Sequence, residues 1–271
     1  MKTFYQLFQE LQSMNLQKVP DLVGRSTHDI AQYRDPNDNR YFAKFSENEL
    51  QSVVEHLAYK IYQLFGIKTP NSHLVTSEAK DLLGIATLKV NGDKAGHPSS
   101  LINHTDITDG FFVDAFLANW DVMGLNFDNV ILSHDKESAT RIDPGGSLTF
   151  RAQGGKKGNL FGHEANEINS FRDPNRSPQA SSVFSNMQKE HFLRAANVFK
   201  TVSWDQIERT INSVQEESTN KLQEITDSEK RLKLLDQINM EFEEISSKLK
   251  SRYQHVMDYI TQHIDNNVQF R

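Results

Sequence analysis

The segment 47–65 constrains the fold most, because its apolar residues recur on one face of a helix. Ser46 and Glu49 are spaced as a capping box at its start, and Gly66 follows its end. The apolar face consists of Leu50, Val53, Val54, Leu57, Ile61 and Leu64. We therefore expect an amphipathic helix that buries this face against a neighbouring layer.

Strand-like runs surround this helix in the first part of the chain. Residues 29–33 and 41–45 flank a cluster of Pro, Asn and Asp, a turn-forming combination that predicts a β-hairpin. Residues 74–76 and 82–90 predict two further strands, and the apolar spacing over residues 4–14 predicts a short amphipathic helix. Together these elements predict a small lobe of mixed helix and strand.

A second, mainly helical lobe is predicted for the rest of the chain. The segment 91–99 is rich in Gly, Pro, Asn and Ser and indicates a boundary, so we expect lobes over residues 1–96 and 97–271. Residues 109–120 are strongly apolar and predict a buried helix that includes Phe111, Phe112, Phe116 and Trp120. From about residue 188 onward the pattern is helical almost throughout. The predicted fold class is α+β with two lobes.

The highly charged, nearly Gly-free stretch 216–250 fits two arrangements. It could extend from the helical lobe as a protruding arm, or it could fold back as a helical hairpin. The periodicity of the sequence is compatible with both.

Charge and composition exclude several classes of protein. The chain has 30 Lys and Arg against 36 Asp and Glu, and this net charge of -6 disfavours a general nucleic-acid binder. It has no Cys, which excludes disulfides, thiolate zinc sites and cysteine nucleophiles. No run of about 18 apolar residues occurs, so we expect no transmembrane segment or signal peptide and a cytoplasmic protein.

Lys44 and Glu55 form the first candidate pair. Lys44 lies in a predicted strand directly before the helix that carries Glu49 and Glu55. Phosphoryl transfer from ATP needs a cation on the phosphates, and a helix carboxylate can hold a strand lysine in place for that purpose. Glu55 suits this role, because the cap explains Glu49. An edge-strand lysine beside a solvated helix face would give the same pattern.

Asp121, Asn129 and Asp143 form a second constellation in the predicted helical lobe. They lie on two polar segments around short strand-like runs at 129–133 and 139–142. Carboxylate and amide oxygens are ligands that suit Mg²⁺, and a carboxylate beside an incoming hydroxyl can accept its proton. Loop Asp and Asn residues also form turns and caps. The agreement between two separate loops favours a site for a metal and for orienting a nucleophile.

Together these residues resemble the protein-kinase-like fold in its atypical branches, which include the HipA-type toxin kinases and the phosphoinositide lipid kinases. Three segments are similar to an uncharacterised family of bacterial and phage kinase-like proteins; they are ANWDVMGLNFDNVILS (118–133), RIDPGGSLTFRAQGG (141–155) and FRDPNRSPQASSVF (171–184). Some members of that broader group are secreted effector kinases of intracellular bacteria. The resemblance covers about residues 22–205.

The resemblance implies a role for each of the five residues. Lys44 would bind the ATP phosphates and Glu55 would hold Lys44. Asp121 would orient or deprotonate the acceptor, while Asn129 and Asp143 would hold Mg or Mn. One feature departs from ordinary kinases, whose metal-binding Asn lies five residues after the catalytic Asp.

In this chain the position five residues after Asp121 is Asn126, whereas the family that the chain resembles favours Asn129. The two asparagines therefore compete for the role of metal ligand. The apolar run Val130 to Leu132 would anchor Asn129 at the end of a buried strand, which favours Asn129.

Two further segments could bind phosphate. In the loop 24–31, which has a single Gly, the resemblance places Arg25, Ser26 and Thr27 where a phosphate-covering loop should lie; a plain turn between strands is the alternative. The second segment is Gly-rich, follows Asp143 and contains Arg151, Lys156 and Lys157. This basic segment could bind a phosphorylated substrate or an inositol polyphosphate activator, or it could be a solvated loop.

We therefore expect an atypical kinase that transfers the γ-phosphoryl group of Mg-ATP to a hydroxyl, first of all a protein Ser or Thr. An inositol lipid or a small molecule is the second possible acceptor. If the protein is a secreted effector, it would act in the cytosol of a host cell. The alternative from a different class is a catalytically inactive kinase-like scaffold that binds a partner protein through its C-terminal helices.

Overall fold

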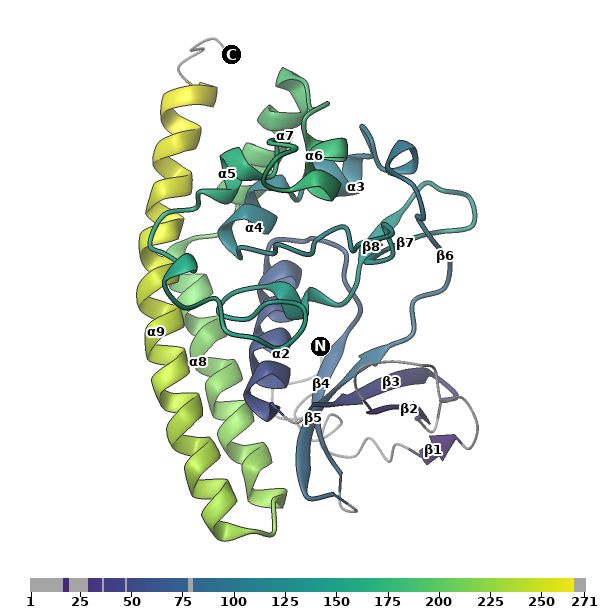
Figure 1. The fold of residues 1–271 in the computed structure, drawn as a ribbon, viewed down its shortest axis with the longest axis vertical. Helices are drawn as coiled ribbons and strands as arrows, with labels where there is room; N and C mark the ends of the chain where they lie inside the picture. Colours follow the sequence, from purple (N-terminus) through teal and green to yellow (C-terminus); the bar gives the residue numbers. More distant parts are fainter. Residues whose placement is uncertain (1–16, 20–28, 36, 47, 78–79, 266–271) are drawn as a thin grey trace, which may run out of the picture.

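The computed structural model describes residues 17–19, 29–35, 37–46, 48–77 and 80–265. The helix predicted over residues 4–14 and the loop residues 24–28 lie outside the described residues. Figure 1 shows a strand-rich part at one end of the molecule and a helix-rich part at the other, with two long helices beside both.

A five-stranded antiparallel sheet forms the strand-rich part, in the order β1-β2-β3-β5-β4. Its strands are β1 (Gln17–Val19), β2 (Asp29–Arg34), β3 (Arg40–Phe45), β4 (Ser72–Ser77) and β5 (Leu82–Leu88). In the pairing of β2 with β3, Asp29 lies opposite Phe45, which confirms the predicted hairpin. Tyr41 and Phe45 are buried in a small apolar cluster. Because side chains alternate along a strand, Lys44 points to the opposite face.

Helix α2 (Glu49–Leu64) packs against β3, β4 and β5, and it buries its apolar face as the sequence predicts. The predicted capping box at its start is wrong. The N-cap is Asn48, whose N–H donates to Ser46 Oγ. Glu49 instead accepts a hydrogen bond from the backbone N–H of Leu83 and forms an ion pair with Lys230, at 3.0 Å. Glu49 therefore joins α2 to β5 and to the C-terminal helix.

Short helices and a second small sheet form the helix-rich part. The sheet has the order β6-β7-β8, with β6 (Asp93–Lys94), β7 (Val130–Leu132) and β8 (Ala139–Arg141). The helices are α3 (Thr105–Thr108), α4 (Phe111–Phe116), α5 (Glu167–Ser170), α6 (Pro178–Phe184) and α7 (Lys189–Lys200). Its short 3-10 turns are η1 (Pro98–Ser100), η2 (Pro144–Gly146) and η3 (Gly158–Leu160), whereas η4 (Leu222–Glu224) lies beside β4, where Glu224 contacts Thr76.

Helix α4 is shorter than the helix predicted over residues 109–120. Its helical turns end at Phe116, and Ala118 has a positive φ of 50°, so the chain leaves the helix there. Phe111, Phe112 and Phe116 are fully buried, as predicted. Trp120 is 38% exposed, which corrects its assignment to the core. The early end of α4 frees the following segment to form a loop.

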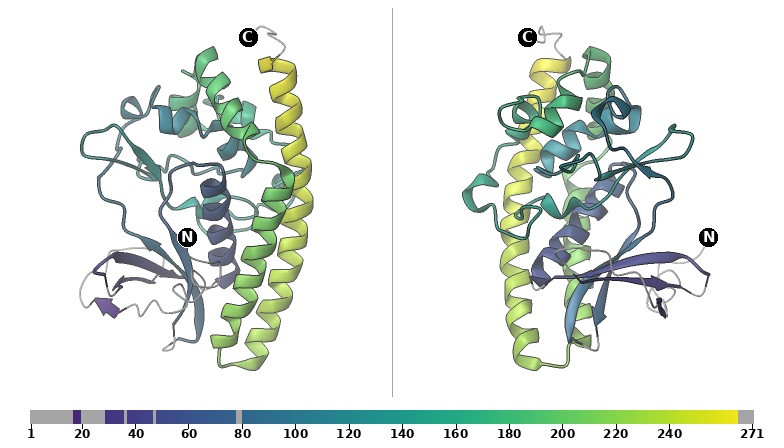
Figure 2. Two further views of the ribbon diagram at one scale, coloured as in Figure 1. Left: turned by 180° about the vertical axis from the view of Figure 1, so that it is seen from behind. Right: turned by 45° about the vertical axis from the view of Figure 1, so that its right-hand side comes forward.

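The last part of the chain forms a helical hairpin. Helix α9 (Ser228–Ile260), followed by a π-helical turn (Thr261–Asp265), runs the length of the molecule, and the shorter α8 (Trp204–Lys221) lies beside its first part (Figures 1 and 2). Both helices contact α2, and α9 also contacts α4, so the charged stretch packs along the body and does not protrude as an arm. None of the described helices has the length and apolar character needed to cross a membrane.

Candidate active site

Lys44 of β3 and Glu55 of α2 form a close ion pair, with Nζ and Oε2 2.7 Å apart. The Glu55 side chain is only 3% exposed. Burial lowers the pKa of Lys44, but the carboxylates of Glu55 and Asp143 outweigh burial and raise that pKa above its usual value. Burial raises the pKa of Glu55 to about 7, against the opposing effect of Lys44. The structure thus brings the predicted pair together and keeps Lys44 a cation.

Asp143 also contacts Lys44, with 2.9 Å between Oδ1 and Nζ. It lies between β8 and the turn η2, and its side chain is 57% exposed. Its backbone has φ 49° and ψ 58°, a left-handed conformation that non-glycine residues rarely adopt. This conformation directs the Asp143 carboxylate toward Lys44. One cation from the sheet therefore touches carboxylates from both α2 and the loop after β8.

Asp121 and Asn129 are joined within the loop that follows α4. The Asn129 amide nitrogen donates to the backbone oxygen of Asp121 at 2.7 Å and to its Oδ2 at 3.1 Å. Asn129, directly before β7, is 9% exposed, whereas Asn126 is exposed. Of the two competing asparagines, the geometry therefore brings Asn129 to Asp121.

Backbone contacts bring the two loops together. The N–H of Ile142 donates to the oxygen of Asn129 at 2.9 Å, and the N–H of Trp120 donates to the oxygen of Gly146 at 3.3 Å. A Cβ atom placed on Gly146 would lie 3.0 Å from the Cβ of Asp121, so glycine allows this close approach. Asp121 and Asp143 consequently face the same region from neighbouring loops.

The environment of Asp121 favours its neutral form more than water does. Burial raises the pKa of Asp121, the hydrogen bond from Asn129 opposes that effect, and the charges of Asp143 and Asp128 add to the rise. A carboxylate whose pKa lies closer to neutral is a better proton acceptor at physiological pH. This environment suits a residue that receives the proton of a hydroxyl.

The side-chain oxygens of Asn129 and Asp143 suit a hard divalent cation. The amide nitrogen of Asn129 donates to Asp121, so its carbonyl oxygen is the atom of this side chain that could bind a cation. No group of three or more His, Asp or Glu side chains within the described ranges could hold a metal by itself. Mg²⁺ in phosphoryl-transfer sites is held in this way, by one or two protein oxygens together with substrate phosphates. The donor set thus fits Mg²⁺ or Mn²⁺ bound with a nucleotide.

The predicted basic segment 151–158 needs correction. Lys157 is 3% exposed, and its ammonium donates to the backbone oxygens of Ala118, Gly146 and Leu148 at 2.7 to 2.9 Å. An ammonium that donates to three carbonyls has no hydrogen left for a polyanion. Lys157 instead links the loops before Asp121 and after Asp143.

Lys156 is also engaged, since it forms an ion pair with the buried Glu241 of α9. Arg151 and Lys156 are exposed, but Lys156 is paired and Lys157 is buried. The three side chains therefore do not form one open cationic surface. Arg25, Ser26 and Thr27, the predicted phosphate-binding residues, lie outside the described residues.

The sequence patterns did not predict two residues of α2 that lie at the site. Gln51 Nε2 lies 3.4 Å from the backbone oxygens of Gly145 and Arg151, and the hydroxyl of Tyr59 accepts the N–H of Asp143 at 2.8 Å. Together with Glu55, they recur at every fourth position and therefore share one helix face. The repeat of Gln, Glu and Tyr at every fourth position of this helix was the signal that could have revealed them.

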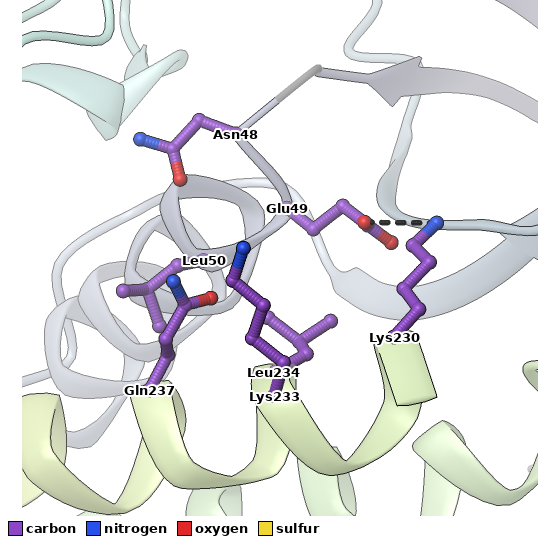
Figure 3. A pocket seen from close by; sticks show the side chains of 7 residues that line it. All are labelled: Asn48, Glu49, Leu50, Lys230, Lys233, Leu234 and Gln237. Atoms are coloured by element: carbon purple, nitrogen blue, oxygen red, sulfur yellow. Dashed lines mark ion pairs between the residues drawn. The ribbon is translucent and has the colours of Figure 1, made fainter. Parts of the chain in front are cut away.

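An open pocket of about 440 Å³ lies elsewhere, between the start of α2 and the first turns of α9 (Figure 3). Its lining residues are Asn48, Glu49, Leu50, Lys230, Lys233, Leu234 and Gln237. The ion pair between Glu49 and Lys230 lies across it. The pocket includes none of the acidic or basic residues of the candidate site.

Solved structures resemble this fold. A proinflammatory kinase of Helicobacter pylori, CtkA, matches with a TM-score of 0.50 and 13% sequence identity, over 90% of this chain and 97% of that chain. An N-terminal 618-residue fragment of LepB from Legionella pneumophila matches with a TM-score of 0.38 and 15% identity, over 83% of this chain and 46% of that chain. No protein-family model matches the chain, and no curated protein matches it significantly.

The chain therefore has a two-lobed, kinase-like α+β fold, with a small antiparallel sheet lobe and a helical C-terminal part. This confirms the fold class predicted from the sequence. At 13% identity the likeness to CtkA concerns the fold alone.

Proposed function

We propose that the protein is an atypical kinase that transfers the γ-phosphoryl group of ATP to a hydroxyl. The observation that supports this most is the ion-paired arrangement of Lys44 with both Glu55 and Asp143, beside the pair formed by Asp121 and Asn129. Phosphoryl transfer depends chiefly on positioning and on stabilising charge, and these five side chains supply both. We also propose that it belongs to the HipA-type or phosphoinositide-kinase-like branch of this fold.

Each residue has a distinct task in the proposed reaction. Lys44, held by Glu55, binds the phosphates of ATP. Asp121 orients the acceptor hydroxyl and takes its proton, and Asn129 holds the Asp121 carboxylate in place. The oxygens of Asn129 and Asp143 hold Mg²⁺ or Mn²⁺, which neutralises charge on the phosphates when bound. The negative charge on the leaving ADP is thus stabilised by Lys44 and by the metal ion that Asn129 and Asp143 would hold.

A Ser or Thr of a protein is the first proposed acceptor, and an inositol lipid or a small molecule is the second. The proposed setting is the cytoplasm, or the cytosol of a host cell if the protein is a secreted effector. An inositol polyphosphate activator has less support than the kinase itself, because Lys156 is paired with Glu241 and Lys157 is buried. Nucleic acid is not a proposed partner, because a net charge of -6 repels polyanions.

The scaffold alternative has less support from the fold. It required the C-terminal helices to act as an interaction arm, whereas the inner faces of α8 and α9 are packed against α2. His56 of α2 contacts Glu217 of α8, and Arg252 of α9 donates to backbone oxygens of Ala115 and Phe116 in α4. The hairpin is therefore an integral part of the body.

Transfer of label from γ-labelled ATP tests the proposal. Purified protein is incubated with Mg²⁺ or Mn²⁺, with and without host-cell extract, beside an Asp121→Asn variant. Asp236→Asn, at an exposed position of α9, is the matched control for loss of one carboxylate. We expect label on protein or lipid with wild type and the control, and its loss with Asp121→Asn. Absence of label together with absence of a nucleotide-induced thermal shift would favour the scaffold.

A further inference from the structure

Tyr59 is a buried residue of α2 that touches the proposed metal-binding loop. It lies one helical turn after Glu55, is 2% exposed, and accepts a hydrogen bond from the backbone N–H of Asp143 at 2.8 Å. Burial, with the charges of Glu55 and Asp143, raises the pKa of Tyr59 well above its usual value. Its hydroxyl therefore stays protonated and neutral across the physiological range.

The backbone that Tyr59 contacts is in an unfavourable conformation. Asp143 has φ 49° and ψ 58°, a region that costs free energy for any residue with a Cβ. The residue that follows is Pro144, and a residue before proline prefers an extended backbone. Neither local preference supports the observed conformation, so contacts from outside the loop must hold it.

The contacts that hold this loop from outside include three from the sheet and from α2. Lys44 pairs with the Asp143 carboxylate, Gln51 reaches the backbone oxygen of Gly145, and Tyr59 accepts the N–H of Asp143 itself. The first of these contacts would change when Lys44 and Asp143 engage the nucleotide and metal of the proposed reaction. The contact from Tyr59 uses only backbone of the loop, so it can persist throughout.

We propose that Tyr59 is a positioning residue, whose hydroxyl keeps Asp143 in its left-handed conformation and thereby aims the carboxylate at the metal. The inference rests on the proposed kinase function for the identity of the ligand. Its geometric part, that the hydroxyl holds the Asp143 amide, is independent of that function. The two parts are tested separately.

The geometric part is tested by Tyr59→Phe in nucleotide-free protein. Phenylalanine keeps the ring packing and removes only the accepting oxygen. Tyr253→Phe is the matched control, because the hydroxyl of Tyr253, in α9, donates to the backbone oxygen of Val202 at 2.9 Å, outside the Asp143 loop. We expect amide hydrogen exchange at Asp143, followed by NMR, to accelerate in Tyr59→Phe and to be unchanged in Tyr253→Phe. Equal protection of Asp143 in all three proteins would overturn the inference.

The functional part is tested by titrating Mg²⁺ against the thermal shift produced by a non-hydrolysable ATP analogue. Loss of a residue that orients a metal ligand weakens metal binding about 10-fold or more, so we expect Tyr59→Phe to raise the Mg²⁺ concentration at half-effect by that factor. Tyr253→Phe should leave the concentration unchanged. A purely structural role would lower the metal-free melting temperature in both variants and alter the Mg²⁺ dependence in neither, and that result would refute the positioning role.

A double variant shows whether Tyr59 acts through Asp143. In an Asp143→Asn background, Tyr59→Phe should cause no further change in the Mg²⁺-dependent shift, because residues that act as one unit are not additive. Independent, additive effects would contradict the inference. If wild type shows no Mg²⁺-dependent shift while Asp143 exchange still responds to Tyr59→Phe, the kinase proposal and the metal-directing role fail, and the contact alone stands.

Discussion

The imidazole of His56 joins the helix that carries Glu55 to the C-terminal hairpin, with 3.2 Å between its Nε2 and Glu217 Oε2. On the other side of the ring, Nδ1 lies 2.9 Å from the hydroxyl of Ser72 in β4. His56 is fully buried, and it follows Glu55 directly in the sequence. The position of Glu55 in the site is therefore coupled to the packing of α8 on α2.

This contact predicts a loss of stability in acid. Burial lowers the pKa of His56, although Glu217 opposes that effect, and burial lowers the pKa of His73 to about 4. A histidine whose pKa is lowered by folding stabilises the fold above its unfolded pKa of about 6.5, and that contribution is lost as the pH falls below it. For His73 the loss occurs between about pH 6.5 and 4.

The measurement is the change in melting temperature between pH 7.5 and pH 5 for wild type and His56→Gln. Glutamine can keep a hydrogen bond to Glu217 without titrating. Carboxyl groups with a raised pKa, such as Glu55, act in the opposite direction, so the difference between the two proteins is the quantity that decides. We expect wild type to lose more stability than His56→Gln on acidification. An equal loss in both would show that His56 does not contribute.

Removal of Lys44 should affect activity and stability in separable ways. In Lys44→Met the buried Glu55 loses its counter-charge, and breaking a buried ion pair by removing one partner costs about 3 kcal/mol or more. A second change, Glu55→Gln, removes the stranded charge and should restore much of the stability. Neither variant should transfer phosphate.

The pH dependence of Lys44→Met supplies an internal check. Without Lys44, Glu55 can avoid the unpaired charge by taking up a proton, because burial already raises its pKa. A group with a raised folded pKa stabilises at low pH and loses that contribution as the pH rises. We therefore expect urea unfolding to show a larger defect at pH 8 than at pH 6. A defect that is independent of pH would argue against an ionised Glu55 as its source.

Arg141 and Asp114 form a fully buried ion pair, and its loss should be costly. The guanidinium donates to both carboxylate oxygens, at 2.8 and 2.7 Å, and Tyr62 also donates to Asp114. Arg141→Met should lower the free energy of unfolding by about 3 to 5 kcal/mol, because Asp114 is left as a buried unpaired charge. The exposed pair of Arg34 with Asp38 is the control, where Arg34→Met should cost about 1 kcal/mol or less. Urea denaturation compares the two, and equal costs would contradict this account.

Local patterns predicted much of the fold. The hairpin of β2 with β3 and the helix α2 follow from alternation and helical periodicity within short segments. The spacing of Lys44 from Glu55 reflects a strand followed directly by a helix, and here too neighbouring elements suffice. Contacts between distant segments were beyond such patterns, because the sequence does not state which surfaces meet.

Glu49 and Lys157 illustrate this limit. The local spacing of Glu49 fits a cap, yet its carboxylate is used by Leu83 and by Lys230, far along the chain. Lys157 lies in a Gly-rich basic segment that looks solvated, yet it is buried because three backbone oxygens from two other loops converge on its ammonium. In both cases tertiary contacts override the local preference of the residue.

Gly146 offers a test of the spacing between the two loops of the proposed active site. A Cβ at this position would lie 3.0 Å from the Cβ of Asp121, so Gly146→Ala should push the Asp121 loop away from Asp143. Misplacement of a reacting group by about 1 Å can cost about 100-fold in rate, and we expect a loss of that order in phosphate transfer. Gly155→Ala is the control, because a Cβ there would meet no atom within 4 Å. Melting temperatures measured beside the transfer assay separate misplacement from unfolding, and full activity in Gly146→Ala would show that the approach of Asp121 to this turn does not set the rate.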